Sequence, residues 1–287
     1  MRGSLLTGRY PARNGLAHQL VKEENCYGVG LPHRERILPQ YLQPAGYATG
    51  CFGKWNIGFA AGSRPTERGF DEFFGCRSGN IHYFNHTYHG DYDLFRGTER
   101  ARTEGYSTEL FTEAACDFVR RHAAEPFFLY VPYNAPHFAY DPNYAPGETM
   151  EPWLVPEKYL ERYGRTEADA DEQVRYWAVL SAIDDGVGRV LDVLDELKLS
   201  DDTLVMYVSD MGAILRHKQG AGVASNGPFR DGAPSVYEGG VRVPAIFRWP
   251  GRIEPGTTSA ALLSNLDLLP LCLHAAVPNL LASPPPS

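Results

Sequence analysis

Apolar residues recur along this chain in two different patterns. Over residues 107–122 and 171–197 they are spaced three and four apart, which predicts two amphipathic helices. Shorter helical patterns lie at residues 37–42 and 266–276. Four compact apolar runs, bounded by Gly, Pro, Asp or Ser, predict buried strands at residues 47–52, 127–131, 203–208 and 243–249.

The predicted strands and helices alternate, which is typical of an α/β protein with a mostly parallel central sheet flanked by helices. We expect one α/β core over residues 1–276 and a Pro- and Ser-rich tail over residues 277–287. Residues 81–102 and 137–166 have no clear period and are rich in aromatic residues, Gly, Pro and charge. Long loops of this kind often border an active site or bind substrate.

Composition narrows the function classes. With 287 residues, 43% of them hydrophobic and 22% charged, the chain is an ordinary globular protein. Its net charge of −8 argues against general nucleic-acid binding, and no apolar run reaches the roughly 18–20 residues of a membrane span. The first residues lack the apolar segment of a secretory signal. The five cysteines show no metal-like spacing, and we interpret them as mainly free thiols.

Three polar residues directly follow predicted strands. Lys54 follows residues 47–52, His137 follows 127–131, and Asp210 follows 203–208. Because ligands of α/β sheets gather at the carboxyl ends of strands, we expect these side chains around one crevice, together with Arg2. Such cations suit a tetrahedral sulfate or phosphate, and the carboxylate suits a divalent cation. Each residue taken alone is more simply a surface lysine, a loop histidine or a turn cap.

Longer stretches of sequence make this prediction more specific. Arg2, Leu5, Thr7, Gly8 and Arg9 have the spacing Arg-x-x-Leu-x-Thr-Gly-Arg. Five further blocks follow in order: GYATGCFGKW at 46–55, RGFDEFFG at 68–75, PFFLYVPYNAPH at 126–137, LSAIDDGVGRVLDVLDELKLSDDTLVMYVSDMG at 180–212, and SNGPFRDGAPSVYEGGVRVPAIFRW at 225–249. Together these blocks, collinear over about residues 2–270, resemble the sulfatase family, in its arylsulfatase A and galactosamine-6-sulfatase branch.

The resemblance implies an alkaline-phosphatase-like fold and hydrolysis of aryl or carbohydrate sulfate monoesters by formylglycine and Ca²⁺. It implies that Arg2 orients the formylglycine and that Lys54 contacts the sulfate. His137 is expected to contact the sulfate and assist the leaving group, Arg230 to bind the substrate, and Asp210 to bind calcium. The implied partner is a sulfated small molecule or glycan. Family members are typically periplasmic, extracellular or lysosomal, and the location of this chain stays open.

By the family pattern, the cysteine that becomes formylglycine falls three positions before Met1. The first strand, with its paired aspartates, and most of a small C-terminal domain also fall outside residues 1–287. We therefore expect a sulfatase core that is truncated at both ends.

Three positions inside the chain depart from the family pattern. Asn56 stands where a histidine is expected, and an amide cannot take up a proton at neutral pH. Met211 replaces an asparagine metal ligand, and a thioether binds hard cations poorly. Ala233 replaces a lysine that would contact sulfate. We expect weak or absent calcium binding and little sulfatase activity.

Other interpretations stay open at this point. One alternative is a degenerate sulfatase that only binds sulfated glycans, through Arg2, Lys54, His137 and Arg230. Another is an incomplete gene product. A related phosphomonoesterase or phosphodiesterase is a further alternative, although the Gly-Lys-Trp and Glu-Gly-Gly motifs favour an enzyme that acts on sulfate esters.

Overall fold

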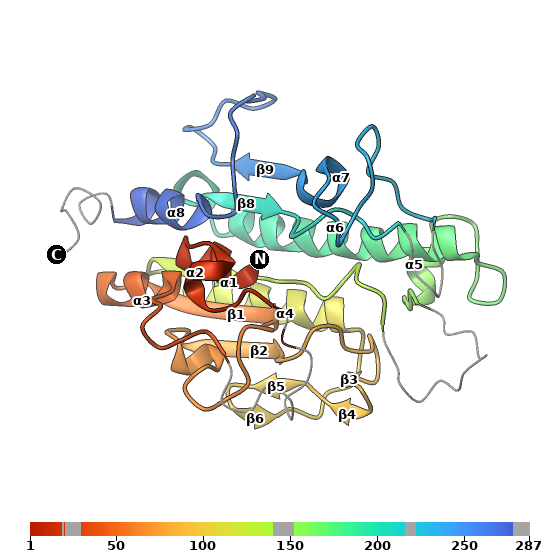
Figure 1. Ribbon diagram of the computed structural model, residues 1–287, viewed down its shortest axis with the longest axis horizontal. Coiled ribbons are helices and arrows are strands. Elements are labelled where there is room, and N and C mark those ends of the chain that lie inside the picture. Colours follow the sequence, from red (N-terminus) through yellow and green to blue (C-terminus); the bar gives the residue numbers. More distant parts are fainter. Residues whose placement is uncertain (19, 21–29, 140–151, 216–221, 278–287) are drawn as a thin grey trace.

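The computed structural model describes residues 1–18, 20, 30–139, 152–215 and 222–277. Its largest element is a five-stranded sheet in the order β6-β5-β2-β1-β7 (Figure 1). These strands are β1 (Ala48–Lys54), β2 (Glu72–Cys76), β5 (Phe95–Arg96), β6 (Glu99–Arg100) and β7 (Phe127–Tyr130). The α/β architecture predicted from the sequence is confirmed.

The centre of this sheet is parallel. β1 pairs in parallel with β2 on one side and with β7 on the other, and Lys54 is in register with Cys76 at the carboxyl ends. β5 and β6 add an antiparallel edge. A separate hairpin, β3 (Thr87–Tyr88) and β4 (Asp91–Tyr92), lies in the same loop region, residues 81–102.

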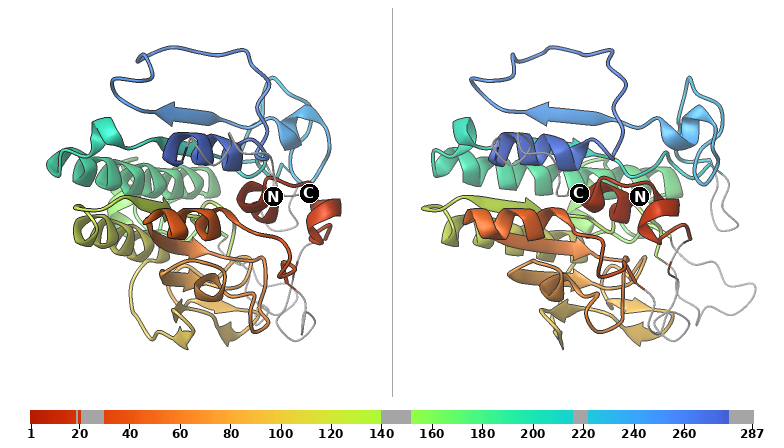
Figure 2. Two further views of the ribbon diagram at one scale, coloured as in Figure 1. Left: turned by 90° about the vertical axis from the view of Figure 1, so that its left-hand side faces the viewer. Right: turned by 60° about the vertical axis from the view of Figure 1, so that its left-hand side comes forward.

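A second, two-stranded sheet forms the other side of the molecule. Here β8 (Val205–Val208) pairs antiparallel with β9 (Ala245–Arg248). Figure 1 and Figure 2 both place β9 at the opposite end of the molecule from β5 and β6. Among the described strands, β7 pairs only with β1 and β8 only with β9. We call these two strands, together with residues 209–215 and 222–242 between them, the β8–β9 ribbon.

Side chains of β1 and β2 alternate between two apolar layers. Cys51 and Phe73 pack with Leu6 of α1 (Arg2–Thr7), Leu38 of α3 (Leu38–Leu42) and Leu273 of α8 (Leu268–Ala276). Phe52 and Phe74 point to the opposite face, where α4 (Ser107–Arg121) covers them. This two-sided burial is the reason that parallel strands read as continuous apolar runs.

The long helix α6 (Glu172–Glu196) packs against α4. Small residues of α6 make this contact possible: a Cβ at Gly186 would lie 2.7 Å from the hydroxyl oxygen of Thr112 on α4. α6 also contacts α5 (Glu157–Glu161), which forms inside the predicted loop 137–166.

Short elements complete the chain: α2 (Pro11–Asn14), α7 (Glu238–Val241), and the 3₁₀ turns η2 (Gln43–Ala45), η3 (Pro65–Glu67) and η4 (Ser200–Asp202). The predicted tail lies outside the described residues except for Val277. Within the described part, no helix combines the length and apolar character needed to cross a membrane. The described cysteines, Cys51, Cys76, Cys116 and Cys272, are free thiols.

Candidate anion-binding site

Lys54 is the last residue of β1, and its side chain is only 5% exposed. The preceding Gly53 has φ of 138° and lies so close to the main chain of Pro132 that a Cβ would come 2.3 Å from the Pro132 oxygen. The Lys54 amide donates to the same oxygen at 2.7 Å. The end of β1 is thus held tightly against the segment after β7, which brings the lysine towards His137.

The surroundings of Lys54 disfavour its positive charge. Burial, followed by repulsion from Arg2, lowers the pKa of Lys54 to about 7, while Cys76 and Asp210 act in the opposite direction. Within the described residues, no hydrogen bond or ion pair engages its ammonium group. A buried ammonium without a fixed counter-ion is a favourable partner for an anionic ligand.

Arg2 reaches the site from the start of α1. Figures 1 and 2 show this helix between the five-stranded sheet and the β8–β9 ribbon. α1 ends at Gly8, whose φ of 63° suits glycine. The Arg2 Nη2 atom lies 3.4 Å from Oδ2 of Asp210, which follows β8. Arg2 therefore bridges the two sheets.

His137 completes the group. Burial, then the positive charge of Lys54, lowers the pKa of His137 to about 4. Its Nδ1 atom lies 2.9 Å from the carbonyl oxygen of Phe138. A carbonyl only accepts, so Nδ1 must carry the hydrogen and Nε2 is the unprotonated nitrogen. At neutral pH the ligand-free histidine is an acceptor rather than a cation.

The structure thus brings Arg2, Lys54, His137 and Asp210 into one electrostatic neighbourhood, since Arg2, Lys54 and Asp210 all act on the pKa of His137. Arg230 does not act on the pKa of Lys54 or His137, and its guanidinium lies 3.8 Å from the centre of the Tyr237 ring.

The structure also describes the three positions that differ from the family pattern. Asn56 has φ of 52°, and its side-chain amide donates to the Leu20 carbonyl at 3.0 Å. Met211 is 44% exposed beside Asp210. Ala233 is 7% exposed and its amide donates to the carbonyl of Ala213.

The residues at Asp210 do not fit a calcium ion. One carboxylate is followed by a thioether, and the guanidinium of Arg2 already lies beside that carboxylate. In the described ranges, no group of three or more His, Cys, Asp or Glu residues is arranged to hold a metal ion.

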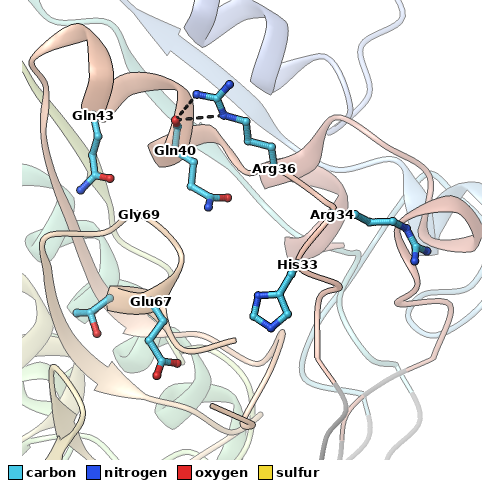
Figure 3. A pocket seen from close by; sticks show the side chains of 8 residues that line it. His33, Arg34, Arg36, Gln40, Gln43, Glu67 and Gly69 are labelled. Atoms are coloured by element: carbon cyan, nitrogen blue, oxygen red, sulfur yellow. Dashed lines mark hydrogen bonds between the residues drawn. The ribbon is translucent and has the colours of Figure 1, made fainter. Parts of the chain in front are cut away.

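Surface hollows also lie elsewhere in the described part of the chain. Figure 3 shows a polar cavity of about 680 Å³, which His33, Arg36, Gln40, Gln43 and Glu67 line. An apolar groove of about 420 Å³ lies between β9 and α8, lined by residues such as Phe247, Trp249 and Leu271. Neither includes Arg2, Lys54, His137 or Asp210.

Comparison with known proteins decides the family. The sulfatase family profile matches residues 1–277. This chain belongs to the sulfatase family. It is 33% identical to N-acetylgalactosamine-6-sulfatase of the dog (Canis lupus familiaris) and 34% identical to that of the mouse (Mus musculus). Both alignments cover 96% of this chain but 52% of the relative, so the sulfatase chain spans about half the length of these curated relatives. Arylsulfatase J of the mouse is 31% identical over 96% of the chain and 44% of its own length.

Solved sulfatase structures agree with the fold. The structure of Ps i-CgsB in complex with k-i-k-neocarrahexaose superposes with a TM-score of 0.82 at 28% identity, over 96% of this chain and 60% of that one. BT4656 in complex with D-glucosamine-2-N,6-O-disulfate superposes with a TM-score of 0.66 at 20% identity, over the whole of this chain and 67% of that one. The second similarity shows the fold alone.

Sequence reasoning missed the residues that surround His137. Asn80, Tyr83 and Trp153 donate to main-chain oxygens next to it. Their partners are backbone atoms of another segment, so no motif spacing reveals them. The aromatic loops at 81–102 and 137–166 were the one available signal, because two of these residues lie within them.

Proposed function

We propose that this chain is the sulfate-binding core of a carbohydrate sulfatase, and that the residues it contains bind a sulfate monoester but sustain little hydrolysis. The buried ammonium of Lys54, close to Arg2 and His137, is the observation that supports the binding half. The relatives favour a carbohydrate ligand, and the N-acetylgalactosamine-6-sulfatases favour a hexosamine with a 6-O-sulfate.

The roles follow from charge and hydrogen-bonding capacity. Lys54 and Arg2 neutralise sulfate oxygens, Lys54 with the greater gain because water does not screen a buried charge. A bound anion restores the protonated state of Lys54 at pH values where the ligand-free lysine is losing its proton. Arg230 is a further cation for the ligand only if it leaves the ring of Tyr237.

Three features support weak hydrolysis. The neutral His137 has no proton on Nε2 to give to a departing alkoxide. Asn56 cannot replace a histidine in proton transfer, and its amide is already bonded to Leu20. With Met211 and Ala233 in place of an oxygen ligand and a cation, the sulfuryl oxygens lack two further sources of positive charge.

The experiment is calorimetric titration of the purified chain with N-acetylgalactosamine 6-sulfate, with N-acetylgalactosamine as the matched sugar, alongside an aryl-sulfate and an aryl-phosphate assay. We expect binding of the sulfated sugar only, and no turnover of either ester. Equal binding of both sugars, or of neither, overturns the sulfate-binding role. Turnover of the aryl sulfate that Lys54→Ala abolishes overturns the proposed impairment. Turnover of the aryl phosphate alone favours the phosphatase alternative.

A further inference from the structure

Three consecutive carbonyl groups around His137 each accept a hydrogen bond from a different buried side chain. Trp153 Nε1 donates to the Pro136 oxygen at 3.0 Å, Tyr83 Oη to the His137 oxygen at 2.7 Å, and Asn80 Nδ2 to the Phe138 oxygen at 3.2 Å. These donors are 7%, 0% and 9% exposed, respectively. We call Asn80, Tyr83 and Trp153 the carbonyl clamp.

The clamp comes from two separate parts of the chain. Asn80 and Tyr83 belong to the segment that follows β2, and Trp153 lies just before α5. That segment is itself tied to the His137 segment, because Asn134 Nδ2 donates to the Ile81 oxygen at 3.0 Å. The main chain on both sides of His137 is therefore fixed from outside its own segment.

One clamp contact acts directly on the imidazole. The Phe138 oxygen accepts from Asn80 and also from His137 Nδ1. Because that oxygen points at Nδ1, it favours the tautomer that carries the hydrogen on Nδ1. The neighbouring contact from Tyr83 fixes the orientation of the preceding peptide group. If either donor is removed, a partly buried carbonyl loses a hydrogen-bond partner, and the peptide groups turn towards another donor.

We propose that Tyr83 and Asn80 are positioning residues that hold His137 in one orientation and one tautomer, with unprotonated Nε2 available to accept a hydrogen bond from a hydroxyl group of the ligand. This inference rests on the proposed sulfate-binding role of the site, but the histidine itself can be observed without ligand.

The test compares Tyr83→Phe with Tyr106→Phe. The two tyrosine rings stack at 5.4 Å and are 0% and 2% exposed, but the Tyr106 hydroxyl donates to none of the clamped carbonyls. Nitrogen-15 NMR of the ligand-free chain at pH 7 reports the tautomer of His137. The wild type and Tyr106→Phe should give one protonated Nδ1 and one unprotonated Nε2. In Tyr83→Phe the two shifts should move towards each other as both tautomers become populated.

A second readout follows the ligand. Tyr83→Phe should weaken binding of N-acetylgalactosamine 6-sulfate roughly three- to tenfold, and Tyr106→Phe should leave it within about twofold. An unchanged His137 spectrum in Tyr83→Phe overturns the inference, whatever the ligand does. A changed spectrum with no sulfate binding by the wild type supports the clamp and overturns the proposed function instead. If Tyr83→Phe does not fold, Asn80→Ser removes the donor to Phe138, and the same spectral comparison applies.

Discussion

The two sheets contribute to the site in opposite ways. On the five-stranded sheet, Lys54 is 5% exposed, and His137 lies in a segment fixed by three buried donors. On the β8–β9 ribbon, the Asp210 side chain is 47% exposed and Met211 is 44% exposed. The first side carries the residues expected to bind sulfate, and the second carries the position expected to bind metal.

The difference in burial means that substitutions in the two parts of the site should have different effects on stability. Positive charge at Lys54 is maintained against a burial penalty, whereas Asp210 needs only an exposed contact with Arg2. Exposed ion pairs contribute about 0–1 kcal/mol, so a substitution at Asp210 should cost little stability. On the buried side, by contrast, a change of residue should alter the free energy of unfolding strongly, because Lys54 is held in surroundings that disfavour its charge.

The largest expected effect comes from Lys54→Met. Below pH 7 the free energy of unfolding of the variant should be about 2–5 kcal/mol greater than that of the wild type, because a buried charge is replaced by an apolar group of similar length. Binding of the sulfated sugar should weaken about 10- to 100-fold. Urea denaturation and calorimetry measure both changes. Lys158→Met, at an exposed lysine paired with Glu109, is the control and should change neither by much. Loss of stability in Lys54→Met contradicts the buried-charge account.

The next effect is on pH dependence. The pKa of Lys54 in the free chain is about 7, so affinity for the sulfated sugar should fall up to about tenfold per pH unit above that value. The groups acting on Lys54 are Arg2, Cys76 and Asp210. Calorimetry in buffers of different ionisation enthalpy should show proton uptake on binding at pH 8. Lys54→Arg should bind without this uptake, and an equal uptake in that variant would assign the proton to another group.

A smaller effect concerns acid stability. The folded chain holds the pKa of His137 at about 4, against about 6.5 when unfolded, so the unfolded state binds more protons in that interval. His137 therefore lowers the free energy of unfolding as pH falls from 6.5 to 4, and His137→Gln should abolish this loss of about 2–3 kcal/mol.

Asp93 is the internal comparison. Burial raises its pKa to about 6, so it adds stability as pH falls through that value. Urea denaturation at pH 4.5 and 7 measures the slope, and an unchanged slope in His137→Gln refutes the assignment.

The smallest effect tests the ribbon. Calcium at 5 mM should shift the unfolding temperature of the wild type by less than about 1 °C. Met211→Asn restores one oxygen ligand and should add a shift of about 1–3 °C. Met211→Leu, which adds no oxygen, is the matched control for differential scanning calorimetry. A large calcium shift in the wild type would show that Asp210 has ligands other than those we identified.

Much of the fold could be predicted from the sequence. All four predicted strands and both long helices form, because compact apolar runs and three-to-four spacing are typical of these elements. The expected burial of the last two strands was wrong: no residue of β8 or β9 is fully buried, and Ile246 is 61% exposed. β2 was not predicted as a strand, since Phe73 and Phe74 were interpreted only as part of a motif. Large apolar residues alone do not mark the buried face of α6: Leu180 is 37% exposed, while Ala178 and Ala182 are buried. Close packing against α4 selects small residues there, and a hydrophobic pattern gives them little weight.

The site divides in the same way. The expectation that strand ends bring Lys54, His137 and Asp210 together agrees with the electrostatic influence of Lys54 and Asp210 on His137. Parallel pairing accounts only for Lys54 and His137, whose strands β1 and β7 are neighbours, whereas Asp210 follows β8 in the other sheet. The antiparallel pairing of β8 with β9 was not predicted, since apolar runs contain no information on direction. The neutral state of His137 also needs coordinates, because it depends on burial and on the position of one carbonyl oxygen.

The break between the two sheets has a practical consequence for handling the protein. β7 and β8 each pair with a described strand on one side only, which leaves main-chain N–H and C=O groups without a strand partner. Unpaired strand edges are templates for another chain, so two molecules in a concentrated sample can join through them. Protein concentration is therefore a variable in every measurement proposed above, and dilution series and light scattering belong beside each titration.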